Sequence, residues 1–405
     1  MKKQETAKRR NSAIEFWRFF FAIAITGYHI AFIFPMMYVN GSTGYYLQSS
    51  NWMKGAGEIL FVFTLTAGYF LVKHFKRLQS DPEYKKKSAS SRAFEYLWAR
   101  VKALIPVLIL GILLGIFAYS AFKGITIVEV IREAVNGIWE FFGLYIAGFS
   151  ASTAAGQPNG ALWFISALLI CSYFLYWLIC KNEDLLSGFI APFLFVFLGG
   201  WWSLTGTRAA QTGWSTIGAQ VLANNATSGT ASTGTAFIGF NNGLLFVLLG
   251  MCGGILIYYL VQKLKEKKFG PTAKTLLTFL YIIVAGLLVW YTVYPSTFFE
   301  FERWTVHLLC IVLVALTLLK VDGISKVLDN KATAGILNYL GGSALYIYMI
   351  HIPIVYMVLM VLGKNTVTTA YTWAQIFWPV AIISTIVGLF LKYIMDKYVI
   401  KKKEA

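Results

Sequence analysis

Charged side chains are scarce in this chain, and their scarcity excludes an ordinary soluble fold. Only 13% of its 405 residues are charged, 18 acidic and 35 basic, whereas soluble domains carry about 25%. Hydrophobic residues make up 58% of the chain, and the mean hydropathy is +0.64. This composition predicts an all-α membrane protein that crosses the bilayer several times.

Familiar catalytic and nucleotide-binding motifs are also missing. The sequence has no P-loop, GxSxG elbow, HExxH motif or Rossmann fingerprint in a credible context, and no metal site is expected. The basic start MKKQETAKRR precedes an apolar stretch that is too long for a signal peptide and has no small-residue cleavage site. The first span is therefore expected to be retained. The four cysteines lie within apolar runs without paired spacing, and we interpret them as core residues: Cys171, Cys180, Cys252 and Cys310.

Ten apolar runs are long enough to cross a bilayer as helices. They cover approximately residues 14–35, 56–73, 102–122, 161–180, 186–204, 240–262, 273–293, 303–320, 339–362 and 374–396. With a cytoplasmic N-terminus, the inner segments hold 28 Lys and Arg residues and the outer segments hold 6. This excess predicts that both termini are cytoplasmic. We thus expect a basic N-terminus (1–13), a ten-helix membrane domain (14–396) and a basic tail (397–405).

Three segments between the runs have distinct compositions. The inner segment 73–102 is expected to be a long basic loop. The outer segment 123–160 begins with an amphipathic pattern that suits a helix lying at the interface or a half-helix dipping into the outer leaflet. The outer loop 205–239 is rich in small polar residues and predicts a flexible cover. Trp163, at the outer start of the fourth run, is suited either to anchor that helix at the interface or to stack on a sugar.

Two ionisable residues, Arg18 and His29, lie inside the first apolar run. Charge is costly in lipid, so an ionisable residue within a span indicates a functional site. Eleven residues of α-helix bring the two side chains back to nearly one face, roughly 16 Å apart. Glu15 lies one turn before Arg18 and is placed to pair with it. An imidazole titrates near neutrality, which suits His29 to general-base work.

Other polar residues occur at the ends of neighbouring runs. Glu58 lies in the outer end of the second run and needs a partner, for which His29 or Lys54 is suitable. It is either a carboxylate that orients the base or one half of a structural pair. Arg100 and Lys102 open the third run, where they either anchor the helix or grip phosphate oxygens.

The remaining histidines have different surroundings. In the ninth run, Ser343, Tyr348 and His351 could together line a polar groove, although a lone buried histidine is more often a core residue. His74 lies among lysines at an inner helix end and is expected to be solvated. His307 lies within a span, and we assign it no role.

Six segments of the chain follow one another in a characteristic order. They are IEFWRFFFAIAITGYH, GEILFVFTLTAGYFL, FEYLWARVKALIP, ALWFISALL, FNNGLLFVLLGMCGG and LGGSALYIYMIHIPI. In this order they resemble the bacterial integral-membrane acyltransferases of acyltransferase family 3, over about residues 12–397. Lys102 here stands where the family's basic motif carries a second arginine.

The resemblance implies transfer of acyl groups, commonly acetyl, to extracytoplasmic glycans and lipids. It implies that Arg18 contacts the acyl donor, that His29 is the catalytic base, and that Arg100 and Lys102 hold the phosphates of acyl-CoA (acetyl-CoA) arriving from the cytoplasm. No permanently bound cofactor is implied. The expected partners are membrane lipid, acyl-CoA and a cell-envelope glycan or lipid-linked saccharide, without nucleic acid, at the bacterial cytoplasmic membrane. Many relatives carry an extra esterase-like domain, so we expect either direct transfer here or a separate partner protein.

Two other functions fit the sequence in part. A transporter or flippase for a small metabolite or glycan would also use ten helices with a polar core, but it would not need the basic inner segment with its Arg-x-Lys pair. A polysaccharide polymerase or another lipid-linked glycosyltransferase usually has large outer loops with Arg and Asp clusters, and no such cluster occurs in this sequence. Binding of acyl-CoA separates the first hypothesis from the other two.

Overall fold

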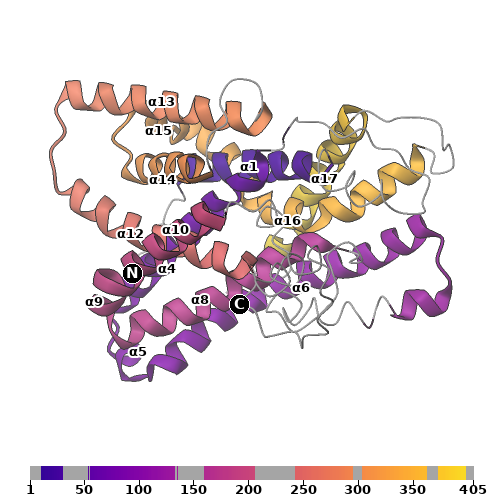
Figure 1. The fold of residues 1–405 in the computed structure, drawn as a ribbon, viewed down its shortest axis with the longest axis horizontal. Helices are drawn as coiled ribbons and strands as arrows, with labels where there is room; N and C mark the ends of the chain where they lie inside the picture. The colour runs from indigo at the N-terminus through magenta and orange to yellow at the C-terminus, as the bar shows by residue number, and fades with distance from the viewer. Residues whose placement is uncertain are drawn as a thin grey trace, which may run out of the picture.

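The structure is a computed structural model, and it describes residues 11–30, 53, 55–132, 135, 159–205, 242–294, 303–362 and 373–397. Regular secondary structure in these ranges is helical throughout (Figure 1). The principal helices are α1 (Ser12–Tyr28), α3 (Ala56–Ile59), α4 (Phe61–Leu78), α5 (Pro82–Lys86), α6 (Ala89–Lys123), α8 (Trp163–Lys181), α10 (Ala191–Thr205), α12 (Asn242–Lys265), α13 (Pro271–Val293), α14 (Arg303–Leu319), α15 (Gly323–Leu328), α16 (Lys331–Val361) and α17 (Trp373–Met395).

The predicted all-α membrane fold is confirmed. Eight helical segments of the described chain are long and apolar enough to cross a bilayer. The other two expected spans correspond to α1 and α14, which have 17 residues each. All ten expected runs are therefore helical where the structure describes them. The cytoplasmic orientation of the termini remains a prediction.

The inner segment 73–102 was expected to be a loop, and it is largely helical instead. The α4 helix continues to Leu78, α5 follows, and α6 begins at Ala89, well before the predicted start of the third span. The side chains of Asp81 and Ser88 accept hydrogen bonds from backbone N–H groups in the first turns of α5 and α6, which starts both helices. With 35 residues, α6 is longer than the roughly 30 Å hydrocarbon layer requires, so it projects beyond it.

Small residues allow α4 and α12 to pack closely. A Cβ atom added to Gly68 would lie 2.0 Å from the carbonyl oxygen of Met251, and one added to Gly254 would lie 2.0 Å from that of Leu65. Helices in membranes associate through such close backbone contacts, because lipid tails are as apolar as the side chains. The two helices therefore form a tightly packed pair.

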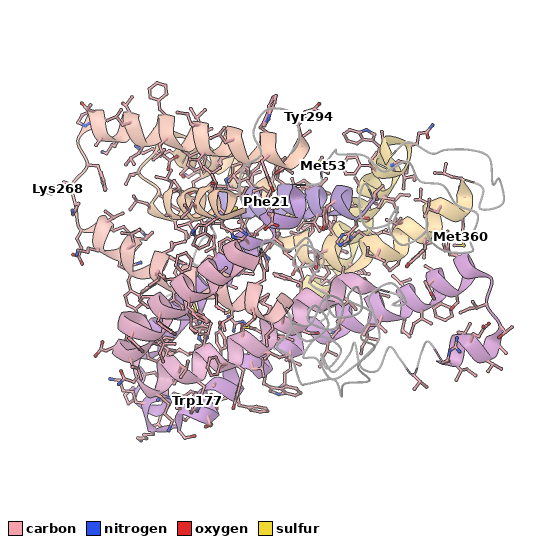
Figure 2. The ribbon with its side chains drawn as sticks, viewed as in Figure 1. Phe21, Met53, Trp177, Lys268, Tyr294 and Met360 are labelled. Atoms are coloured by element: carbon pink, nitrogen blue, oxygen red, sulfur yellow. The ribbon has the colours of Figure 1, made fainter. Side chains whose placement is uncertain are left out.

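The α1 helix packs along α16, and α16 also contacts α6 and α17. At the α1–α16 contact, a Cβ atom on Gly341 would lie 2.4 Å from the Cβ atom of Glu15. Phe21, in the middle of α1, is fully buried (Figure 2).

The spanning helices differ in how much of their apolar part is buried. In the most apolar 18-residue stretch of each helix, 72% of the residues are buried in α3–α4 and in α16, but only 22% in α13. The central helices thus carry the buried polar residues, and α13 presents an apolar surface suited to lipid.

Several predicted segments lie outside the described residues. They are residues 1–10, most of the outer segment 123–160, nearly all of the outer loop 205–239, and the tail from residue 398.

Candidate active site

Two histidines from different helices meet at the centre of the site. His29 lies at the end of α1, and His351 lies in the second half of α16. The Nδ1 atom of His29 lies 2.9 Å from the Nε2 atom of His351, and the two ring centroids are 4.9 Å apart. The close packing of α1 on α16 places these residues together, although they are 322 positions apart in the chain.

Hydrogen-bond partners assign the tautomers of this pair. His351 Nδ1 lies 2.7 Å from the carbonyl oxygen of Tyr348, and because a carbonyl can only accept, Nδ1 must carry the hydrogen. In a neutral His351 the Nε2 atom is then an acceptor, so His29 Nδ1 must donate to it. The lone pair of His29 therefore lies on Nε2, where it can take up a proton.

Beside the histidine pair, an asparagine side chain replaces a helix hydrogen bond that a proline cannot make. Pro353 lies inside α16 and has no N–H to donate to the carbonyl four residues earlier, that of Met349. The side chain of Asn159 donates to this carbonyl oxygen at 2.8 Å and to that of Gly111 at 3.1 Å. Sequence reasoning missed Asn159; the proline within an apolar run was the signal that a backbone carbonyl needed another donor.

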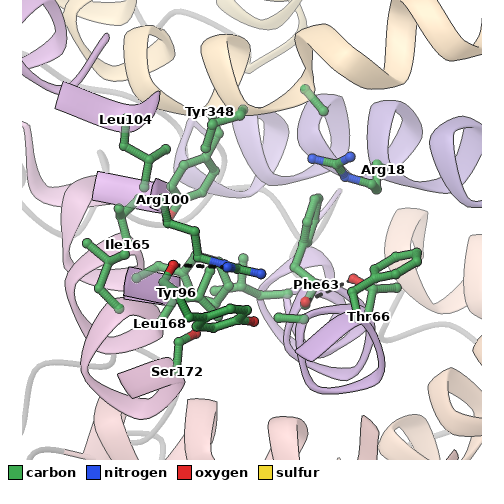
Figure 3. A pocket seen from close by; sticks show the side chains of 17 residues that line it. Arg18, Phe63, Thr66, Tyr96, Arg100, Leu104, Ile165, Leu168, Ser172 and Tyr348 are labelled. Carbon is green, nitrogen blue, oxygen red and sulfur yellow. Dashed lines mark hydrogen bonds between the residues drawn. The ribbon is translucent and has the colours of Figure 1, made fainter. Parts of the chain in front are cut away.

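Tyr348, whose ring contacts His351, is part of the lining of a cavity of about 270 Å³. Figure 3 shows Tyr348 with other side chains of this lining. Its hydroxyl donates to the carbonyl oxygen of Ala161 at 2.7 Å, and its ring packs against Phe164 and His351. Arg18, Arg100 and Tyr348 line this cavity among mostly apolar side chains. The structure thus brings together three of the predicted site residues.

Arg100 is held by aromatic stacking. Its guanidinium carbon lies 3.4 Å from the ring centroid of Tyr96, and it donates to the backbone carbonyl of Tyr96 at 3.2 Å. Tyr96 in turn stacks on Tyr176 with centroids 3.8 Å apart. His74 hydrogen-bonds to the hydroxyl of Tyr176 at 2.9 Å, so the expectation of a solvated His74 is wrong: it belongs to this partly buried network.

A second cavity, of about 510 Å³, shares part of its lining with the first. Arg18 is an ion-pair partner of Glu15 at 3.0 Å, as the sequence predicted, and both residues line this second cavity. Arg18 lines both cavities, and so do Phe70, Leu104 and Leu345. We call the cavity beside Tyr348 the outer cavity and the second one the inner cavity.

Comparison with known protein families decides the class of protein. Residues 11–397 match the family model described as an acyltransferase domain. The chain belongs to this acyltransferase family. No curated protein and no solved structure matches the chain. With its spanning helices, the chain is a membrane acyltransferase, and the resemblance drawn from the motifs is confirmed.

Glu58 of this acyltransferase has a different histidine partner from the expected one. Its Oε2 atom lies 2.9 Å from Nε2 of His307 on α14, in a buried pair covered by the ring of Phe61. The histidine that His29 contacts is His351. The interpretation of Glu58 as the group that orients His29 is therefore replaced by a Glu58–His307 pair.

The other candidate residues of the acyltransferase are Ser343, Lys102 and Trp163. Ser343 is buried and donates to the carbonyl of Leu340 at 2.7 Å. Lys102 is exposed beside the ring of Trp98, at 5.2 Å, because it lies on a different face of α6 from Arg100. Neither Ser343 nor Lys102 lines the two cavities in the part of the chain that the structure describes. Trp163 begins α8, and Lys54 lies outside the described residues.

Proposed function

We propose that this membrane acyltransferase is an O-acyltransferase, acetyl being the simplest group, that moves an acyl group from cytoplasmic acyl-CoA to a hydroxyl of an extracytoplasmic cell-envelope glycan or lipid-linked saccharide. Membership of the family supports acyl transfer. The observation that carries the rest is the His29–His351 pair, whose hydrogen bonds leave a proton-accepting Nε2 on His29. The ring of His351 packs against that of Tyr348, which lines the outer cavity.

In the proposed reaction, His29 Nε2 takes the proton of the acceptor hydroxyl as the oxygen attacks the thioester carbonyl. The tetrahedral intermediate then collapses, the carbon–sulfur bond breaks, and the thiolate leaves. The proton on His29 passes to this thiolate, which yields an ester, a free thiol and a neutral His29. While His29 is protonated, its Nδ1–H continues to donate to His351, so the imidazolium keeps its orientation.

The arrangement of cations favours a donor that enters from the end where α1 begins. Arg18, eleven residues before His29, lines both cavities, and Arg100 lines the outer cavity from α6. We assign both arginines to contacts with the acyl donor, and Arg100 specifically to polar groups of the donor. If the basic segments are cytoplasmic, donor and acceptor reach the histidines from opposite sides of a bacterial cell membrane.

Labelled acetyl incorporation into envelope glycan tests the proposal, with wild type and His29→Ala expressed at equal levels. We expect incorporation by wild type and its loss in the variant. Equal incorporation in both would remove His29 as the base, and His351 would be tested next. If wild type incorporates no label from acetyl, other acyl groups and acceptors are tested; absence of transfer with all of them would return the transporter hypothesis to first place.

A further inference from the structure

The inner cavity has an unusual concentration of positive charge. Among the residues that line it are Arg18 of α1, Lys73 of α4, Lys265 at the end of α12, and Lys320, which follows α14. These cations come from four separate elements, so no single local motif produces their convergence. Glu15 is the acidic residue of this lining.

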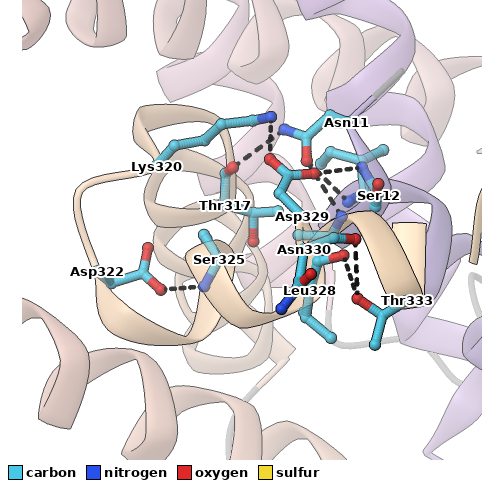
Figure 4. Close-up of polar contacts among 12 residues, drawn as sticks. Asn11, Ser12, Thr317, Lys320, Asp322, Ser325, Leu328, Asp329, Asn330 and Thr333 are labelled. Atoms are coloured by element: carbon cyan, nitrogen blue, oxygen red, sulfur yellow. Dashed lines mark hydrogen bonds and ion pairs between the residues drawn. The ribbon is translucent and has the colours of Figure 1, made fainter. Parts of the chain in front are cut away.

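Two acidic groups pair with cations of this lining. Glu15 pairs with Arg18, and Asp329 pairs with Lys320 (Figure 4). Lys265 and Lys320 lie near enough to repel one another electrostatically. Cations that face one cavity from several helices raise the local concentration of anions, and a ligand with several phosphates would relieve the repulsion among them. Lysine binds phosphate as a compact point charge with three donors, which suits this arrangement.

Lys320 is held in a conformation that ordinary side chains rarely adopt. Its φ is 59°, in the left-handed region where glycine is favoured. Such a backbone is unfavourable for a residue with a Cβ atom. A glycine would therefore fit this turn more easily, and lysine at this position brings an ammonium group to the cavity.

Further polar contacts hold the rim of the cavity in place. Asn11, which also lines the cavity, donates to the carbonyl oxygen of Thr317 at 3.1 Å. The backbone N–H of Ser12 donates to Asp329 at 3.0 Å, and the same carboxylate pairs with Lys320 (Figure 4). The start of α1 and the turn after α14 are thereby fixed to one another, which leaves Lys320 at a defined position.

We infer that the inner cavity binds the phosphorylated nucleotide end of the acyl donor, with Lys73, Lys265 and Lys320 as the phosphate contacts. This inference rests on the proposed function, because it takes acyl-CoA as the donor. Coenzyme A carries a 5′-diphosphate and a 3′-phosphate, and the three ammonium groups match these in sign and number. The arm that bears the thioester then passes Arg18 into the outer cavity and ends near Tyr348. Lys102, which the motif had suggested for this role, lies on the exposed side of α6.

Equilibrium binding of CoA and of dephospho-CoA to the purified full-length protein in detergent tests this inference. The variants are Lys265→Gln, Lys73→Gln and the two combined, all at exposed positions, so folding should be retained; thermal melting checks it. Lys274→Gln, at an exposed lysine of α13 away from the cavity lining, is the matched control. We expect each cavity variant to weaken CoA binding about tenfold, and the control to bind as wild type does. Added salt should weaken wild type more than the double variant.

The outcomes separate the two proposals. Wild-type protein that does not bind CoA would overturn the donor in the proposed function and this site with it. Wild-type protein that binds CoA, with the cavity variants binding as tightly as Lys274→Gln, would overturn the site and leave the donor intact. Weaker binding of CoA alone assigns the changed lysine to the 3′-phosphate, and weaker binding of both ligands assigns it to the diphosphate; either result supports the site.

Discussion

The Nε2 atom of His351 lies 2.9 Å from the Nδ1 atom of His29, and the carbonyl oxygen of Tyr348 determines which of the two atoms carries the hydrogen. The orienting group is thus a second histidine, where many hydrolases use a carboxylate. Its own orientation comes from the backbone of the helix that carries it. This relationship predicts how conservative substitutions will behave.

At His351, substitution by glutamine should lower activity less than substitution by asparagine. Glutamine can place an acceptor oxygen near the position of Nε2, whereas asparagine can replace only the Nδ1 donor. We expect His351→Asn to lower kcat roughly 10- to 100-fold, as seen for residues that orient a functional group through a hydrogen bond, with the donor KM little changed. His351→Gln should retain more of the activity. Steady-state kinetics of acyl transfer measures both, and equal losses in the two variants would contradict an orienting role.

Arg100 should not tolerate replacement by lysine. Its planar guanidinium stacks on Tyr96 with 3.4 Å between the guanidinium carbon and the ring centroid, and an ammonium group cannot reproduce this contact. We expect Arg100→Lys to raise the donor concentration needed for half-maximal transfer, and Arg100→Ala to raise it further. An unchanged dependence on donor in both variants would remove Arg100 from the donor site.

The Glu58–His307 pair should contribute to stability through its hydrogen bond. Removal of either partner leaves a buried polar group with one interaction fewer, at a cost of about 1–3 kcal/mol. We expect Glu58→Leu and His307→Phe each to lower the melting temperature in detergent, and the double variant to be less destabilised than the sum of the two. Strictly additive losses would show that the two residues are not coupled.

Gly341 should be sensitive to any added side chain. A Cβ atom there would lie 2.4 Å from both the Cβ atom and the carbonyl oxygen of Glu15, so α16 would have to move away from α1. We expect Gly341→Ala to destabilise the protein by about 1–3 kcal/mol and to lower transfer, because the contact between His29 and His351 depends on the same helix pair. Gly335→Ala, at a position of α16 where a Cβ atom meets open space, is the control and should melt no lower than wild type, because alanine favours the helix over glycine.

The turn that carries Lys320 should respond to acid. Burial opposes the charged form of Asp329, but hydrogen bonds from Lys320 and from the Ser12 backbone outweigh it and hold the pKa of this carboxyl below its ordinary value. The carboxylate therefore stabilises the fold above the unfolded pKa of about 3.9, and this contribution is lost as the pH falls. Between about pH 5 and about pH 2, the melting temperature of wild type should decline more than that of Asp329→Asn. Parallel declines would contradict this assignment.

The sequence predicted the helices and the local pairs, but it could not predict which distant residues meet. The ten apolar runs follow from hydropathy, and the Glu15–Arg18 pair follows from helical spacing, so both could be deduced without tertiary contacts. The pairing of His29 with His351, and of Glu58 with His307, depends on which helices pack together. A lone sequence does not contain that information in readable form.

The starts of α5 and α6 were missed for a different reason. A hydropathy window ends where polar residues begin, yet α6 starts at Ala89 because Ser88 supplies a hydrogen-bond acceptor for its first turn. The inner cavity was missed as well, since its lysines belong to elements that are remote in the chain. Each of these lysines, considered alone, has the ordinary character of a positive-inside anchor.

Arg18 is part of the wall of both cavities, and this has a consequence for inhibition. A small anionic compound that fills the inner cavity up to Arg18 would block the passage between the two cavities without resembling any sugar. Such a compound would have to act from the side where α1 begins. Resistance to it would arise at Lys73, Lys265 or Lys320, and the histidines could stay unchanged.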